Sequence, residues 1–113
     1  MNINTVLNNI IPAHESKDPY YNYIVRNGIT CKDGFTVSVQ ASCMHYCYPR
    51  KTQKYHTKFE LYCDVSNDKD LLEFYYDGTI CSCVPKGIVE KLILRHGGID
   101  WNLTPRKEKN NGK

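Results

Sequence analysis

Residues 35–43 read FTVSVQASC, and their side chains alternate between apolar and polar types. The apolar positions are Phe35, Val37, Val39, Ala41 and Cys43. The polar positions, Thr36, Ser38, Gln40 and Ser42, lie on the other face. A period of two that includes β-branched residues is typical of a strand with one buried face. The stretch therefore predicts a half-buried strand and a fold built on a sheet.

A second stretch of the same kind runs from about residue 57 to residue 65. Its apolar positions are Phe59, Leu61, Cys63 and Val65, and its expected wet positions are Lys58, Glu60, Tyr62 and Asp64. The connection between the two stretches is too short to hold a crossover helix once the strand ends are counted. The two strands are therefore expected to pair antiparallel.

Turn signals mark shorter strands in the N-terminal third. Residues 12–22 are polar with two prolines and predict a connecting loop, and residues 23–25 begin a short strand. Asn27 and Gly28 form a strong turn dipeptide, after which residues 29–31 predict another strand. Residues 32–34, KDG, form a second turn, so these pieces are expected to be antiparallel and tightly connected.

Further along the chain, residues 66–70, SNDKD, predict a polar turn. Residues 71–76 predict a third long strand. Asp77 and Gly78 form a hairpin dipeptide, and residues 79–84 return as the partner strand. The sequence thus predicts an antiparallel sheet of four or five strands built from hairpins.

Two segments have helical periodicity. In residues 2–11 the apolar stripe is Ile3, Val6, Leu7, Ile10 and Ile11, and Pro12 ends the segment. In residues 85–96 the stripe is Ile88, Val89, Leu92, Ile93 and His96. Gly97 and Gly98 supply a left-handed stop after this second helix. The expected fold class is α+β, with the C-terminal helix covering the sheet and a short helix at the N-terminus.

The chain has 113 residues, enough for one domain and not for two. We expect a single compact domain over residues 1–104 and a flexible basic tail over residues 105–113, PRKEKNNGK. A formal net charge of +3 permits an anionic partner without requiring one. No apolar run is long enough to span a membrane, so no membrane partner is expected.

The connection between the two best strands, residues 43–58, reads CMHYCYPRKTQKYHTK and contains no acidic residue. Arginine and lysine bind phosphate, and a nucleobase can stack on tyrosine. The candidate ligand-binding residues are Tyr46, Tyr48, Arg50, Lys51, Lys54, Tyr55, His56 and Lys58. The alternative is a solvated loop whose tyrosines shield the edge of the core.

The six cysteines are Cys31, Cys43, Cys47, Cys63, Cys81 and Cys83. No basic and apolar export signal precedes them, so we expect a reducing compartment and free thiols. The alternative is a zinc site made by Cys43, His45 and Cys47 together with Cys81 and Cys83. These cysteines lack the Cys-x-x-Cys spacing of zinc knuckles, so neither a metal nor another cofactor is expected.

Signatures of catalysis are missing from the sequence. There is no nucleophile elbow, no paired-carboxylate motif and no glycine-rich phosphate loop. Chance proximity of a cysteine and a histidine is expected with six cysteines and four histidines. We therefore expect a protein without enzymatic activity.

Residues 19–48, PYYNYIVRNGITCKDGFTVSVQASCMHYCY, and residues 84–101, VPKGIVEKLILRHGGIDW, resemble small accessory proteins of phages and prophages of Gram-positive bacteria. The resemblance implies a non-structural protein made in the host bacterial cytoplasm. Small phage accessory proteins often counter host immunity. Some hold an immune effector by protein contact, and others sequester a cyclic or ADP-ribose-type nucleotide signal, usually as oligomers.

Together with residues 43–58, this resemblance implies a phage-encoded inhibitor of bacterial immunity that binds and sequesters an anionic nucleotide signal. Two alternatives stay open. One is an inhibitor that blocks a host defence protein, such as a CRISPR or other immune effector, through exposed tyrosines. The other is a small single-stranded nucleic-acid-binding protein. Assembly into a homo-oligomer also stays open.

Overall fold

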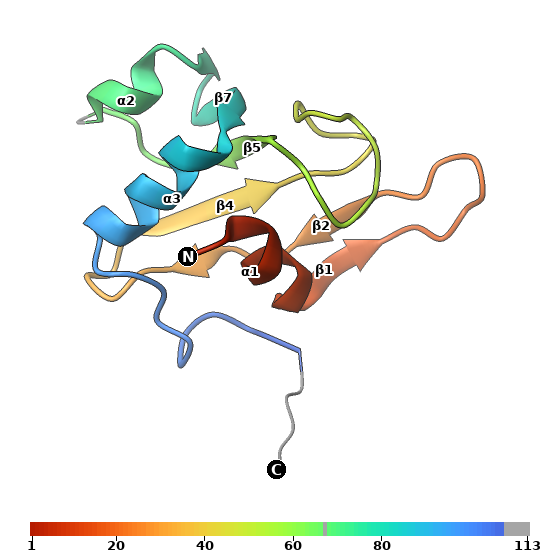
Figure 1. Ribbon diagram of the computed structural model, residues 1–113, viewed down its shortest axis with the longest axis horizontal. Helices are drawn as coiled ribbons and strands as arrows, with labels where there is room; N and C mark the ends of the chain where they lie inside the picture. The colour runs from red at the N-terminus through yellow and green to blue at the C-terminus, as the bar shows by residue number, and fades with distance from the viewer. Residues whose placement is uncertain (67, 108–113) are drawn as a thin grey trace.

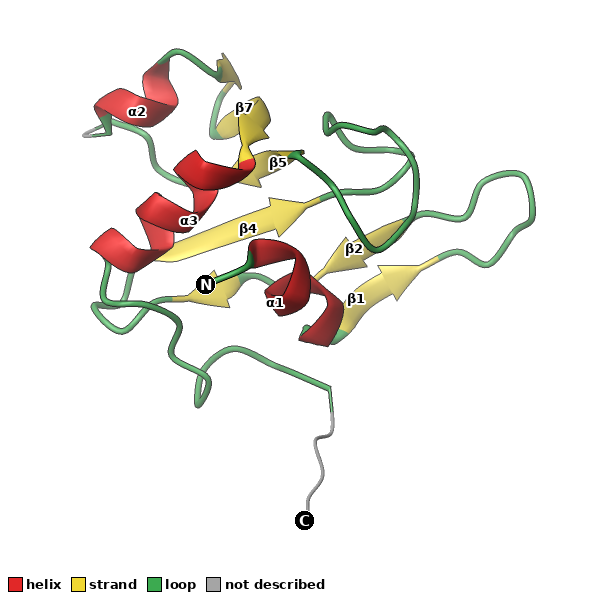
Figure 2. Ribbon diagram, viewed as in Figure 1, coloured by secondary structure: helices red, strands yellow, loops and turns green. Residues whose placement is uncertain are grey.

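The computed structural model describes residues 1–66 and 68–107 (Figure 1). In chain order, the elements are α1 (Ile3–Asn9), β1 (Pro12–Glu15), β2 (Ile24–Arg26), β3 (Ile29–Thr30), β4 (Thr36–Gln40), β5 (Lys58–Tyr62), α2 (Lys69–Leu72), β6 (Tyr75–Asp77), β7 (Ile80–Pro85) and α3 (Lys86–Arg95). Five strands form one antiparallel sheet in the order β3-β4-β5-β7-β6, and β1 pairs with β2 separately. The predicted α+β class is confirmed (Figure 2).

Strands β4 and β5 pair antiparallel, as the sequence predicts. Val39 lies opposite Leu61, and Gln40 lies opposite Glu60. The other edge of β5 pairs with β7, so β5 is the central strand of the sheet. Phe59 and Leu61 of β5 are completely buried. The alternation seen in the sequence thus becomes one apolar face that belongs to the core.

Helix α3 covers this apolar face, and the prediction is confirmed. Val89, Leu92 and Ile93 are buried, and α3 contacts both β5 and β7. Helix α1 packs next to α3 (Figure 2), and the backbone N–H of Ile3 donates to the Glu90 carboxylate at 3.0 Å. Neither helix, nor the short α2, is long and apolar enough to cross a membrane in the part of the chain described.

Two predictions about secondary structure are wrong. The predicted loop at residues 12–22 begins with β1, which pairs with β2 through Glu15 and Ile24. Strand β1 is mostly exposed, so it has no apolar alternation, and its proline sits at the first strand position, where a missing donor is tolerated.

A strand is predicted at residues 71–76, but its first two residues belong to helix α2 instead. Asp68 caps this helix, because its carboxylate accepts the backbone N–H groups of Asp70 and Leu71. An aspartate at this position stabilises the first helical turn. The strand is thereby reduced to β6, at residues 75–77.

The expectation of a wholly wet second face is also wrong. Gln40 is 2% exposed, Ser42 is 0% exposed and Glu60 is 4% exposed. Strand β2 contacts β4, and the connection from residue 43 to residue 57 folds back over this end of the sheet. Tertiary contacts therefore bury polar residues that alternation alone assigns to solvent.

The C-terminal segment docks on α1 as far as Lys107. The backbone N–H of Ile11 donates to Pro105 at 3.2 Å, and that of Lys107 donates to Asn9 at 2.6 Å. The Arg106 guanidinium lies 5.0 Å from the Trp101 ring centroid. The compact part of the chain thus includes residues 105–107. Residues 108–113 of the predicted flexible tail lie outside the described residues.

Candidate ligand-binding groove

The connection between β4 and β5 is held by backbone hydrogen bonds. Tyr48 pairs with Lys58, whose carbonyl accepts the Tyr48 N–H at 3.1 Å. The Tyr48 carbonyl accepts the N–H of Thr57 at 2.8 Å, and the Tyr48–Pro49 bond is cis. The part of the connection between Tyr48 and Lys58 is therefore closed into a loop by backbone pairing.

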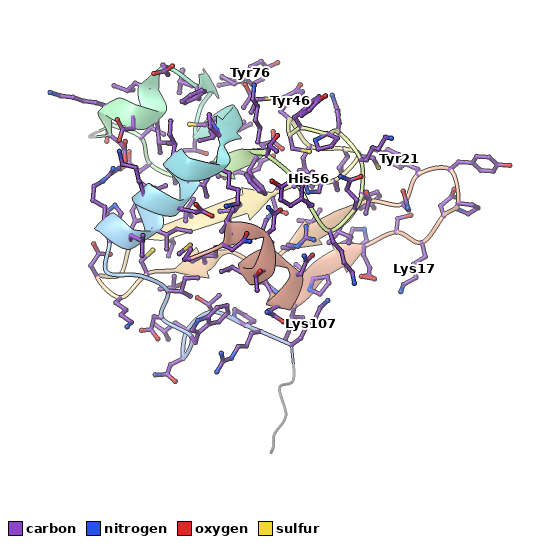
Figure 3. All side chains as sticks on the ribbon, viewed as in Figure 1. Lys17, Tyr21, Tyr46, His56, Tyr76 and Lys107 are labelled. Atoms are coloured by element: carbon purple, nitrogen blue, oxygen red, sulfur yellow. The ribbon has the colours of Figure 1, made fainter. Side chains whose placement is uncertain are left out.

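His56, one of these candidates, lies inside the connection and is 2% exposed (Figure 3). Its backbone N–H donates to Asn4 at 2.9 Å, and its Nε2 atom lies 2.7 Å from the carbonyl oxygen of Lys51. Burial lowers the pKa of His56. Its contacts attach the connection to α1, so the structure places His56 in a supporting position.

A groove of about 530 Å³ opens on the sheet face opposite α3. Its charged and aromatic lining consists of His45, Tyr46, Arg50, Glu60, Tyr62 and Tyr76. These residues come from β5, β6 and the first half of the connection. The groove therefore combines side chains that are far apart in the sequence.

Of the eight candidates, the structure brings Tyr46 and Arg50 together in the groove. The remaining exposed candidates lie elsewhere on the connection and on the first residue of β5: Tyr48, Lys51, Lys54, Tyr55 and Lys58. The predicted set is thus divided between a groove, a buried support and an exposed surface. Its role in binding stays a prediction.

Arg50 is positioned by two contacts. Its Nε donates to the carbonyl of Cys43 at 3.2 Å, and its guanidinium carbon lies 5.2 Å from the centroid of the Tyr46 ring. The terminal nitrogens of Arg50 have no hydrogen-bond partner in the part of the chain that the structure describes. The guanidinium is thus held in place with donors available for an anion.

Tyr46 and Tyr76 form an edge-to-face pair with ring centroids 5.2 Å apart (Figure 3). Their side chains are partly exposed, at 37% and 58%. Tyr62, also on the groove, is 36% exposed. Accessible tyrosine rings beside an arginine are the components on which a nucleobase stacks.

A β-bulge in β7 positions this part of the groove. Phe59 pairs with Val84 and Leu61 pairs with Cys81, so two residues of β7 lie opposite Glu60. One of them, Cys83, has a φ of 52°, and its N–H donates to the carbonyl of Tyr46 at 2.9 Å. Non-glycine residues adopt positive φ rarely, and bulges often reorient side chains next to functional sites. The bulge fixes the backbone of Tyr46 against the sheet.

Glu60 places a carboxylate in the wall of the groove. It is 4% exposed and makes no ion pair with any residue that the structure describes. Burial raises the pKa of Glu60, while the Tyr46 N–H, the Tyr62 hydroxyl and the charge of Arg50 act in the opposite direction. An ionised carboxylate has about four lone-pair sites, so two neighbours leave acceptor capacity for a ligand.

Gln40, in contrast, has its amide fully engaged. Its Oε1 accepts the Arg26 backbone N–H at 2.8 Å, and its Nε2 donates to the Arg26 carbonyl at 2.8 Å and to Ser38 at 2.7 Å. These bonds join β2 to β4. Gln40 therefore supports the groove and has little left to offer a ligand.

Arg26 also supports the end of the sheet beside the groove. Its guanidinium is buried and donates to the carbonyls of Leu7 and Ala41 at 2.9 Å and 3.2 Å. Burial lowers the pKa of His45 to about 4, and the charges of Arg26 and Arg50 act in the same direction. The His45 imidazole, which lies 2.7 Å from Ser42 through Nδ1, is therefore neutral at physiological pH.

A second groove of about 510 Å³ adjoins the first at Ser38 and Tyr62. Its lining includes Phe35, Thr36 and Asp64, and no described lysine or arginine. This second groove offers no positive charge to an anion. The groove that contains Arg50 is therefore the better candidate for an anionic ligand.

The cysteines form no metal site that the structure displays. Within residues 1–66 and 68–107, no group of three or more His, Cys, Asp and Glu side chains is placed to hold a metal ion. All six cysteines are free thiols, and burial raises the pKa of Cys63 to about 12 and that of Cys31 to about 11.

Sequence reasoning missed Glu60, Tyr62 and Tyr76 as groove residues. Glu60 and Tyr62 were assigned to a wet strand face, and Tyr76 to a separate hairpin. The available signal was strand alternation. Glu60 and Tyr62 lie on the same face of their strand as Lys58, the last residue of the stretch 43–58. The contribution of Tyr76 depends on the strand order, which local patterns do not specify.

Comparison of the chain with models of protein families, with curated proteins and with solved structures found no match.

Proposed function

We propose that this protein is a non-enzymatic binding protein that takes an anionic nucleotide into the groove between Arg50 and Tyr76. In the phage setting that the sequence resemblance implies, it would inhibit bacterial immunity by sequestering a nucleotide signal. The observation that carries the proposal is the Arg50 guanidinium, which lies over Tyr46 with its terminal nitrogens available. The guanidinium would bind the phosphate, and the tyrosine rings would contact the base.

The size of the groove supports this proposal. At about 530 Å³, it falls in the range of about 300–1,000 Å³ typical of small-molecule sites. A nucleotide requires one region for its charge and another for its flat base, and Arg50 and the tyrosines supply both. Stacking on an aromatic side chain contributes about 1–3 kcal/mol per base.

The environment of the nucleophilic side chains favours binding over catalysis. The Ser42 hydroxyl lies 2.7 Å from the groove histidine His45, and Ser42 is 0% exposed. Burial raises the pKa of the Cys47 thiol, so little thiolate forms near neutral pH. Neither group offers an activated nucleophile to a molecule bound in the groove.

Calorimetric titration of the purified protein tests the proposal. Its ligands are mononucleotides, cyclic dinucleotides, ADP-ribose and single-stranded oligonucleotides. We expect Arg50→Ala to weaken nucleotide binding at least about tenfold and to flatten its salt dependence, because a phosphate contact is lost. Lys54→Ala is the matched control, since Lys54 is exposed and lies outside the groove.

Equal weakening by both substitutions would place the ligand on the exposed loop instead. Binding restricted to oligonucleotides would favour the single-strand alternative. Absence of any nucleotide binding would refute the proposal.

The second candidate function is to bind and block a host defence protein, and the edge strand β6 favours it. Strand β6 pairs only with β7 among the described strands, and its Tyr75 and Tyr76 are 50% and 58% exposed. An exposed edge can pair with a strand of another protein, and tyrosine is common at binding hot spots. In this case Tyr75→Ala would abolish inhibition in infected cells, whereas Arg50→Ala would leave it intact.

A further inference from the structure

We propose that Glu60 makes the groove selective for guanine over the other nucleobases. This inference rests on the proposed function and specifies the ligand class of the same groove. The groove contains an electrostatic contrast. Arg50 offers donors to an anion, whereas Glu60 offers acceptors and makes no ion pair with any described residue.

The position of Glu60 makes it suitable as a fixed hydrogen-bond acceptor for a ligand. It lies on the central strand β5, which is paired on both edges, so the backbone beneath the carboxylate is firmly held. It is also the single carboxylate in the groove lining among the residues described. A buried acceptor that lines a cavity favours ligands that present a donor to it, because a mismatch leaves polar groups unpaired.

The pattern of donors on the nucleobases then decides the selectivity. An ionised carboxylate can accept hydrogen bonds but cannot donate them. Guanine presents two adjacent donors, N1–H and the N2 amino group, on its Watson–Crick edge. Adenine and cytosine place an acceptor beside their amino group, and uracil flanks its one N–H with two carbonyls. Guanine is therefore the base whose edge matches both carboxylate oxygens.

The other groove residues fit this arrangement. Tyr46, Tyr62 and Tyr76 line the cavity, and the Arg50 guanidinium lies over the Tyr46 ring. A guanine nucleotide has donors at one end and a phosphate at the other. It thus satisfies Glu60 and Arg50 together, whereas a simple anion would satisfy Arg50 and be repelled by Glu60.

Protonation of Glu60 should remove the selectivity. The groups around this carboxylate are Arg50, the Tyr62 hydroxyl, Tyr46 and the Cys47 thiol. Burial has the largest effect and raises the pKa of Glu60, so protonation occurs at a higher pH than for an exposed glutamate. A protonated carboxyl becomes one donor and one acceptor, which suits adenine or cytosine better than guanine.

The test is calorimetric titration of the full chain at neutral pH with the monophosphates of guanosine, inosine, adenosine, cytidine and uridine. We expect the guanosine nucleotide to bind roughly ten- to a hundredfold more tightly than the other three common nucleotides. Inosine keeps the N1–H but lacks the N2 amino group, and it should be intermediate. Glu60→Gln should reduce guanosine affinity, whereas the same change at the exposed Glu73 should not.

The outcomes separate this inference from the proposed function. If the common nucleotides bind within about threefold of one another, Glu60 does not select the base, although nucleotide binding stands. Tighter binding of adenosine or cytidine monophosphate would also overturn the inference. If no nucleotide binds, the proposed function fails first. The nucleotide series with the unmodified chain decides the matter even if the Glu60→Gln variant does not fold.

Discussion

The two faces of the five-stranded sheet differ in how their sequence relates to burial. Toward α3, the alternate residues of β4 and β5, such as Val39 and Leu61, are apolar and buried, as their pattern predicts. On the opposite face Thr36 is exposed, while Gln40 and Glu60 are as deeply buried as the core. The apolar face needs nothing beyond packing, whereas each buried polar group needs a partner.

On this second face, hydrogen-bond partners distinguish a residue that supports the fold from a residue that could bind a ligand. Gln40 obtains its partners from β2 and Ser38, so its burial is explained by the fold. Glu60 has neighbouring donors and the charge of Arg50 acts on it, but it forms no ion pair with any described residue. Comparing the two polar residues therefore identifies the one with acceptor capacity left for a ligand.

The largest expected effect concerns the apolar face. Leu92→Ala should lower the free energy of unfolding by about 2–5 kcal/mol, because Leu92 is 1% exposed and its removal leaves a cavity. Leu94→Ala, on the same helix at 57% exposure, is the control and should change it by less than about 0.5 kcal/mol. Urea unfolding measures both. Equal effects would mean that α3 does not cover the sheet as described.

The next effect concerns buried polar support. Gln40→Ala should destabilise the protein by about 1–3 kcal/mol, because it leaves the backbone N–H and carbonyl of Arg26 without their partners. Gln53→Ala removes an exposed amide that donates to the Tyr55 carbonyl and should cost far less. The same unfolding measurement applies. A negligible effect at Gln40 would show that water replaces its hydrogen bonds.

A pH effect should follow from His45, the buried histidine in the groove lining. The pKa of His45 is lowered from 6.5 to about 4, so the unfolded chain binds the proton more readily than the folded one. The contribution of neutral His45 to the free energy of unfolding is therefore fully present above pH 6.5. It is lost as the pH falls towards 4, by up to about 1.4 kcal/mol per pH unit.

His45→Asn should reduce this loss, as measured by urea unfolding along a pH series. His14→Asn changes an exposed histidine on β1 and should keep the slope of the unmodified protein. Burial shifts the pKa of His56 in the same direction as that of His45, and the raised pKa of Glu60 acts in the opposite sense. The comparison therefore uses the difference between variant and unmodified protein. An unchanged slope in His45→Asn would contradict the burial of its imidazole.

The smallest effect is expected at an open position of the second face. Thr36→Ala should change the free energy of unfolding by less than about 0.5 kcal/mol, since Thr36 is exposed. Measurement at two protein concentrations adds a test of assembly. A loss above about 1 kcal/mol that depends on concentration would indicate that this face is covered in a homo-oligomer.

Local patterns predicted the elements whose burial is one-sided. The alternation of residues 35–43 and 57–65, the helical stripes and the stop at Gly97 all correspond to observed elements. Strand β1 escaped prediction because it is exposed on nearly all sides, and α2 because a cap at Asp68 outweighed the apolar residues that follow. The spacing of apolar residues identifies neither a fully exposed strand nor a helix that is defined by its N-cap.

The candidate site was predicted less completely. The sequence selected residues 43–58 for charge and aromatic content, and Tyr46 and Arg50 do line the groove. His56 is among the predicted candidates, but its hydrogen bonds to Asn4 and Lys51 place it in the interior. Composition identifies which side chains could bind a ligand, but it does not specify which of them face the same cavity.

By itself, the sequence determined the antiparallel pairing of β4 with β5 and the helix that covers their apolar face. These follow from short-range periodicity and from a connection too short for any other arrangement. Only the tertiary structure decided that Glu60 is buried in the wall of the groove that Arg50 also lines and that Tyr76 completes this groove. Those placements depend on the bulge at Cys83, on β2 packing against β4 and on the order of the strands, all of which are contacts between distant parts of the chain.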